Sequence, residues 1–245
     1  MSSNTVYFIT GANRANGLGF GLVKEFASRP NTVVFATARN PDTATELTDL
    51  AKANPNVHVL KLAVDSEADT KRVAAEVERI TGGIDVVIAN AGILNHTGSG
   101  LQTPIAAVEE HFRINTLGPL ILFQALYPLL KARQTRKFFV VSTGAASIKD
   151  IMPLAITAYG SSKAALNFIT RRLHSEHSEE GFVIIPLSPG WVATDMGNTG
   201  ARSVGMEKAP LTVEQSVAGQ VKLIDNAGKE ESGRFWSFDG EELAW

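Results

Sequence analysis

Strand-like and helix-like segments alternate along almost the whole chain, and no other sequence feature constrains the fold as strongly. Segments rich in β-branched and aromatic residues, as is typical of strands, cover residues 5–10, 32–38, 57–64, 85–89, 136–142, 182–187 and 234–238. Amphipathic segments of helix length separate them, near residues 17–28, 43–53, 67–81, 104–131, 155–180 and 212–226. This alternation predicts an α/β fold: a doubly wound parallel sheet of about seven strands with helices on both faces.

Length and composition indicate one domain spanning residues 1–245. Hydrophobic residues make up 44% of the chain, enough for one large core. The formal net charge is -2 and no basic stripe occurs, so we do not expect nucleic acid as a partner. The sequence has no cysteine, no secretory signal pattern and no apolar run near the ~18 residues that cross a bilayer. We therefore expect a cytoplasmic protein without membrane contact. We expect no metal site, because His174 and His177 have helical ligand spacing but no evident third ligand.

A glycine-rich turn follows the first predicted strand. It reads Thr10-Gly-Ala-Asn-Arg-Ala-Asn-Gly-Leu-Gly19 and leads into the first helix. Glycine lets the backbone approach a pyrophosphate closely, and the free N–H groups at a helix start attract its charge. A turn without function is the alternative, but the position directly after strand one favours a dinucleotide site.

The second predicted strand ends at Ala38 and Arg39, where a fold that takes NAD usually carries an acid. Arg14, in the glycine-rich turn, can approach the same place from the other side. Two guanidinium groups and no carboxylate favour the 2′-phosphate of NADP(H) over the ribose hydroxyl of NAD. The alternative is that both arginines are solvated surface residues.

Tyr159 and Lys163 are the candidate proton-transfer pair. They stand four residues apart in a helix-forming segment, so the hydroxyl and the ammonium lie on one face. A free phenol has a pKa of about 10, and a nearby cation lowers that pKa toward neutrality. Tyr159 can then exchange a proton with a substrate oxygen. The same spacing also arises by chance, so the other strand ends must support this interpretation.

Polar residues also stand at the ends of later strands. Asn90 follows the fourth predicted strand, and Ser142 and Thr143 follow the fifth. Asn115 lies within the fourth predicted helix, where asparagine is a mediocre helix former, so it either caps a kink or uses its amide. A glycine-rich stretch near residues 195–212 predicts a mobile substrate lid.

In this order, the motifs resemble the short-chain dehydrogenase/reductase superfamily from end to end. The Thr-Gly-Ala-Asn-Arg turn, the Pro189-Gly-Trp-Val-Ala-Thr-Asp-Met196 segment and the closing Asp239-Gly-Glu-Glu-Leu-Ala-Trp245 are similar to C-factor, sniffer-type carbonyl reductases and fungal norsolorinic acid ketoreductases. The resemblance implies a Rossmann fold and a homo-oligomer, a dimer or tetramer.

The resemblance also implies a role for each site residue. Tyr159 is the general acid, Lys163 lowers its pKa and binds the nicotinamide ribose, and Asn115 holds a water in a proton relay. Thr143, rather than Ser142, aligns with the catalytic hydroxyl. The expected cofactor-binding residues are Gly11, Asn13, Arg14, Gly17, Leu18, Arg39, Val64, Asp65, Asn90, Ala91, Gly92, Tyr159, Lys163, Pro189, Gly190, Val192, Thr194 and Met196.

Three positions depart from the family pattern. Ala15 replaces the second turn glycine, which places a methyl group against the phosphates. Ala63 replaces the aspartate that meets the adenine amine, so Asp65 or the backbone of Val64 must serve instead. Thr143 replaces serine and adds a branch that stiffens χ1.

We therefore expect an NADPH-dependent reductase that converts an aldehyde or ketone to an alcohol. The residues expected to face the cleft are mostly apolar, which predicts a hydrophobic or aromatic carbonyl substrate. The alternative is a dinucleotide-sensing binding protein of the same fold without turnover, which Ala15 and Ala63 would favour.

Overall fold

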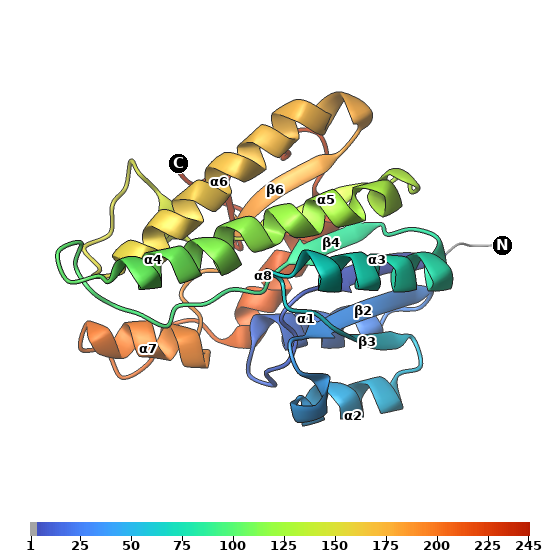
Figure 1. Ribbon diagram of the computed structural model, residues 1–245, viewed down its shortest axis with the longest axis horizontal. Coiled ribbons are helices and arrows are strands. Elements are labelled where there is room, and N and C mark those ends of the chain that lie inside the picture. Colours follow the sequence, from blue (N-terminus) through green and yellow to red (C-terminus); the bar gives the residue numbers. More distant parts are fainter. Residues whose placement is uncertain (1–3) are drawn as a thin grey trace.

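The computed structural model describes residues 4–245, and its centre is a sheet of seven parallel strands (Figure 1). The strands are β1 (Thr5–Ile9), β2 (Thr32–Ala38), β3 (Val57–Lys61), β4 (Val86–Ala89), β5 (Lys137–Val141), β6 (Val183–Ser188) and β7 (Trp236–Ser237). Their order is β3-β2-β1-β4-β5-β6-β7. The predicted doubly wound sheet is confirmed. Each strand lies inside a segment that the sequence predicts or extends beyond it by one residue.

Helices cover both faces of the sheet, because alternate side chains of each strand point to opposite faces. The helices are α1 (Leu18–Ala27), α2 (Thr45–Ala53), α3 (Glu67–Thr81), α4 (Ile105–His111), α5 (Gly118–Lys131), α6 (Thr157–His177), α7 (Asp195–Ser203) and α8 (Val213–Asn226). Phe139 of β5 packs in a core with residues of α1, α2 and α8. Its neighbour Phe138 packs in a second core with residues of α3, α5 and α6.

The strand order reverses between β1 and β4, which are neighbours in the sheet. From β1 the chain winds outward through β2 and β3, and it then returns to place β4 on the other side of β1. The helices after β1 and β4 therefore leave in opposite directions and open a crevice at the carboxyl ends of these strands. This is where a doubly wound sheet binds its ligand.

The predicted helix over residues 104–131 is one continuous rod in which the turn Phe112–Leu117, between α4 and α5, is a π-helix. Asn115 lies in this turn. The rod runs along α6 in Figure 1, and the π-turn contacts α6. A π-turn inserts a residue into the helical ladder and is frequent at functional sites.

The stretch predicted as a lid contains a helix that the sequence does not predict. Helix α7 occupies residues Asp195–Ser203, and Thr194 caps it by accepting a hydrogen bond from the Gly197 N–H at 3.1 Å. The mobility of residues 195–212 stays a prediction. None of the helices among residues 4–245 is both long and apolar enough to pass through a bilayer.

Candidate active site

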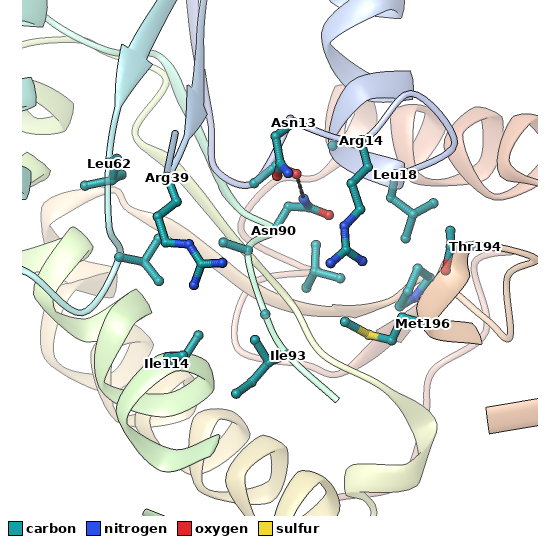
Figure 2. Close-up of a pocket in the computed structure, with 18 of the residues that line it drawn as sticks. Asn13, Arg14, Leu18, Arg39, Leu62, Asn90, Ile93, Ile114, Thr194 and Met196 are labelled. Carbon is teal, nitrogen blue, oxygen red and sulfur yellow. Dashed lines mark hydrogen bonds between the residues drawn. The ribbon is translucent and has the colours of Figure 1, made fainter. Parts of the chain in front are cut away.

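A cleft of about 270 Å³ lies at the carboxyl ends of the strands, around the point where the strand order reverses (Figure 2). It is lined by Gly11, Asn13, Arg14, Asn16, Gly17, Leu18, Gly19, Arg39, Leu62, Ala63, Val64, Asp65, Asn90, Ala91, Gly92, Ile93, Ile114, Val141, Ser142, Tyr159, Lys163, Pro189, Thr194 and Met196. Most of the predicted cofactor residues are therefore brought together in one place.

The glycine-rich turn forms one wall of the cleft and is held by Asn90. The Asn90 Nδ2 donates to the carbonyl oxygens of Thr10 at 2.8 Å and Gly11 at 3.2 Å. Gly11 has a φ of +70°, and a Cβ there would lie 2.8 Å from the Ala91 Cα, so only glycine fits. Asn90 therefore positions the turn.

The start of α1 is open to an anion. Within the described part of the chain, no side chain caps Gly17, the N-cap residue, and the first turn of α1 holds no acid. The free N–H groups and the positive end of the helix dipole are thus available to a phosphate.

Arg14 and Arg39 reach into the cleft from two different elements. Figure 2 shows the side chain of Arg14 extending from the turn after β1 and that of Arg39 from the end of β2, both toward the open space. Among residues 4–245, neither guanidinium forms a salt bridge. Two unpaired cations facing one space make a site for a dianion.

The end of β3 lacks the family's carboxylate. Ala63 lines the cleft, and its backbone N–H donates to the Asp69 carboxylate at 3.0 Å. Asp65 also lines the cleft and forms a salt bridge of 3.1 Å with Arg113. Ala15, whose methyl group we expect against the phosphates, is exposed and lies outside the cleft lining.

Tyr159 and Lys163 lie on α6 and both line the cleft. The Lys163 Nζ donates to the Val141 carbonyl oxygen at 2.7 Å, and burial lowers the pKa of Lys163 to about 8. Burial raises the pKa of Tyr159 to about 12, and a hydrogen bond with Thr143 opposes this rise. The sequence predicts a lowered pKa for Tyr159. The pKa is raised instead, because burial outweighs every other influence on the phenol.

A hydrogen bond with Thr143, and not with Ser142, acts on the pKa of Tyr159. The Thr143 Oγ1 also accepts from the Ala145 N–H at 3.2 Å, and Thr143 lies outside the cleft lining, whereas Ser142 is part of it. The Ser142 Oγ donates to the Asn167 Oδ1 at 2.6 Å in a buried contact. Its hydroxyl is therefore engaged on α6, while the Thr143 hydroxyl shares its surroundings with the phenol.

Asn115 is fully buried and does not line the cleft. Its Oδ1 accepts from the Ile93 N–H at 2.8 Å, and its Nδ2 donates to the Ile93 carbonyl at 2.9 Å and to the Ser162 Oγ at 3.1 Å. Both amide hydrogens are thus used to fix the loop after β4 against α6. A Cβ at Gly92 would lie 3.1 Å from the Asn115 Oδ1 and 3.4 Å from the Lys163 Nζ, so the two side chains approach the same point.

This geometry can be compared with known proteins. A sequence profile described as short chain dehydrogenase matches residues 5–204. The chain belongs to the short-chain dehydrogenase family. The chain is 38% identical, over 255 residues, to the norsolorinic acid ketoreductase of Dothistroma septosporum, a match that covers 100% of this chain and 94% of the relative.

Two solved structures are similar to this chain over their whole length. The carbonyl reductase Sniffer of D. melanogaster has a TM-score of 0.90 and 32% identity, covering 99% of this chain and 100% of that one. The NADPH-bound carbonyl reductase from chicken fatty liver has a TM-score of 0.90 and 34% identity, with the same coverage. The predicted family is therefore confirmed.

Two of the predicted cofactor-binding residues, Gly190 and Val192, lie outside the cleft lining. Gly190 has a φ of +79°, and a Cβ there would lie 2.9 Å from Leu211 and Phe238 side-chain atoms. Val192 is buried and its backbone pairs with Leu211. Both residues shape the path from β6 to Thr194, which does line the cleft.

The cleft lining also includes residues outside the predicted cofactor-binding set: Asn16, Gly19, Leu62, Ala63, Ile93, Ile114, Val141 and Ser142. Of these, Ala63, Ile93 and Ser142 are already considered from the sequence, and the other five are missed. Most are chain neighbours of predicted residues, and that adjacency is a usable signal. Ile114 precedes Asn115 and lies in the π-turn, which the sequence does not predict. Asn16 also donates to the Asp195 carboxylate at 2.9 Å, which links the glycine-rich turn to α7.

Proposed function

We propose that this chain reduces an aldehyde or ketone to an alcohol with NADPH, with Tyr159 as the general acid. The observation that carries the proposal is that one cleft holds both a proton-donating pair and a basic pair. Tyr159 and Lys163 stand next to β5, whereas Arg39 stands at the end of β2, three strands away in the sheet. An extended dinucleotide can reach from one pair to the other across β1 and β4.

The residues in the cleft fit the phosphorylated cofactor. Arg14 and Arg39 suit the 2′-phosphate, and the uncapped start of α1 suits the pyrophosphate. Leu62 and Ile114 supply an apolar surface for a base on the same side as Arg39 (Figure 2), and Val64 also lines the cleft. The chicken carbonyl reductase, with its bound NADPH, supports this choice of cofactor.

The chemistry asks for a proton on the substrate oxygen. NADPH, when bound, supplies the hydride to the carbonyl carbon. A Tyr159 with a pKa near 12 holds its proton at neutral pH and can release it to the more basic oxygen that hydride transfer creates. Thr143 donates a hydrogen bond to the same oxygen as charge develops there. Lys163 keeps a positive charge beside the reaction below pH of about 8.

The substrate we propose is hydrophobic or aromatic, because Ile93 and Met196 line the cleft and Ile148 and Met152 line a second cavity against α6. We propose further that the protein is one domain with a mobile lid, assembles as a dimer or tetramer, and is cytoplasmic. These parts rest on the family resemblance and on the sequence.

Replacing Tyr159 with Phe tests the proposal, because the change removes only the hydroxyl. We expect kcat for a reducible ketone to fall by about 10²- to 10⁴-fold, the usual contribution of a positioned general acid. The NADPH dissociation constant, measured by cofactor fluorescence, should stay within about threefold, because the ring remains.

A Tyr159→Phe protein with parental kcat would contradict the proposal. A wild-type protein that binds NADPH but oxidises none of it with a panel of aldehydes and ketones would instead support the alternative, a dinucleotide-sensing binding protein. Binding without turnover is the feature that separates the two functions.

A further inference from the structure

The segment of residues 147–152, which follows the catalytic Thr143, is bound by Trp245, which comes after the edge strand β7. The main-chain oxygen of Trp245 accepts hydrogen bonds from the Lys149 N–H at 2.9 Å and from the Ser147 Oγ at 3.2 Å. The Ser147 Oγ in turn accepts from the Asp150 N–H at 2.9 Å. One backbone oxygen therefore organises the first half of this segment.

Trp245 itself is anchored to the core. Its ring lies 5.8 Å from the ring of the fully buried Phe235, measured between centroids. The Arg171 guanidinium lies over its other side, 5.9 Å from the ring centroid. The Leu243 N–H donates to the Phe235 carbonyl at 2.8 Å, which fixes the chain just before Trp245. The oxygen that holds the segment is thus itself held.

The segment has little other support. Ile148 and Ile151 are 74% and 75% exposed, and Met152 is 46% exposed. A cavity of about 450 Å³ separates the segment from residues of α6 such as Ser161 and Ala164. Exposed apolar side chains over an open cavity contribute little packing energy, so hydrogen bonds must fix the position of the segment.

The same segment reaches the catalytic centre. The Met152 Cε would lie 3.2 Å from a Cβ placed on Gly144, the residue after Thr143. After Met152 the chain pairs with Gly98, where the Gly98 N–H donates to the Ala155 carbonyl at 2.7 Å, and then enters α6 two residues before Tyr159. Residues 147–152 therefore flank the place where a substrate must meet Tyr159.

We propose that Trp245 is a positioning residue for substrate specificity: it sets residues 147–152 so that Ile148 and Met152 form the apolar side of the substrate entrance. This inference rests on the proposed carbonyl reduction. Trp245 would then control which carbonyl compounds fit, although it is remote in sequence and does not contact the reacting atoms.

Amide hydrogen exchange tests the anchor without any substrate. In Trp245→Ala, the loss of ring packing on Phe235 frees the oxygen, so exchange at Lys149 and Asp150 should become about tenfold faster. Ser147→Ala, which leaves Trp245 intact, should speed exchange at Asp150. Trp236→Ala is the matched control, since Trp236 lies in the same terminal segment but donates to the Glu231 carbonyl at 2.9 Å. It should leave Lys149 and Asp150 unchanged.

Steady-state kinetics test the consequence for specificity. For a bulky aromatic ketone, Trp245→Ala should raise KM about fivefold or more, while kcat on a small aldehyde and the NADPH dissociation constant stay within about twofold. Unchanged exchange at Lys149 and Asp150 overturns the anchor, and faster exchange with an unchanged KM overturns the specificity role. If no carbonyl compound is reduced at all, the proposed function fails, and the exchange experiment still decides whether the anchor exists.

Discussion

The neighbouring residues Ser142 and Thr143 both carry a hydroxyl, but the two hydroxyls have different partners. Thr143 has an extended backbone, with φ of -164° and ψ of 146°, so successive side chains point in opposite directions. The Ser142 hydroxyl turns to Asn167, and the Thr143 hydroxyl turns to Tyr159. A shift by one residue would exchange the hydroxyl that binds Asn167 for the one that acts on Tyr159.

Two single substitutions separate these roles. Thr143→Val keeps the branched shape but removes the hydroxyl, so kcat should fall by about 10²-fold. The loss of the hydrogen bond from the Ala145 N–H should cost only about 0.5–1.5 kcal/mol in the free energy of unfolding. Ser142→Ala leaves the Asn167 oxygen unpaired in the core, which should cost about 1–3 kcal/mol in the free energy of unfolding. Its kcat should change little. Urea unfolding and ketone turnover measure both, and the opposite pattern would assign the catalytic hydroxyl to Ser142.

Lys163 should make stability depend on pH. Its folded pKa of about 8 lies below the unfolded value of about 10.4, so between these values the unfolded chain binds more protons and stability rises with pH. From about pH 7.5 to 9.5, the free energy of unfolding should rise by about 2 kcal/mol relative to a Lys163→Met protein. Above about pH 10 the raised pKa of Tyr159 acts in the opposite direction. Parallel pH profiles for the two proteins would show that Lys163 is charged when folded.

At the scale of elements, α7 depends on one glycine and tolerates change at another. A Cβ at Gly197 would lie 1.8 Å from the Val192 carbonyl oxygen, whereas at Gly200 the nearest atom, in Trp191, is 3.7 Å away. Alanine normally favours a helix over glycine by about 1 kcal/mol. Gly200→Ala should therefore preserve or raise Tm, while Gly197→Ala should lower it and raise KM by displacing α7. Equal effects of the two substitutions on Tm and KM would contradict this account.

Most elements could be predicted from the sequence, because their patterns are local. The β-branched strands and the amphipathic helices appear where the sequence places them, and so does the Tyr159/Lys163 spacing. The π-turn could not be predicted, since Asn115 is held there by Ile93, 22 residues away, and by Ser162, 47 residues away. Helix α7 could not be predicted either. Its glycines disfavour a helix, and the Trp191 Nε1, which donates to the Gly197 carbonyl at 2.9 Å, is a contact made by the fold.

The raised pKa of Tyr159 could not be predicted from the sequence either. Residue spacing predicts the neighbouring cation, but the degree of burial is a property of the packed site. The basic pair was easier to predict, because Arg39 directly follows β2 and Arg14 lies in the turn after β1, and the topology places both at one edge of the sheet.

Cofactor binding should stabilise the whole molecule, because the cleft joins segments from residue 11 to residue 196. At about 100 times its dissociation constant, NADPH should contribute about 2.7 kcal/mol, which raises Tm by about 5–10 °C in a protein of this size. NADH at the same concentration should raise Tm less. Arg39→Ala should reduce the difference between the Tm shifts caused by NADPH and by NADH. Equal shifts with NADPH and NADH would contradict the assignment of Arg14 and Arg39 to a 2′-phosphate.

The shortest strand has a consequence for solubility. All six residues of β6 are buried, and β7 covers its outer side with only the pairs Leu187 to Trp236 and Ser188 to Ser237. An uncovered apolar strand is a template for pairing with a second chain and for fibrous aggregation, and natural proteins shield such edges with short strands. The two residue pairs between β7 and β6 thus shield this edge of the sheet from pairing with a second chain.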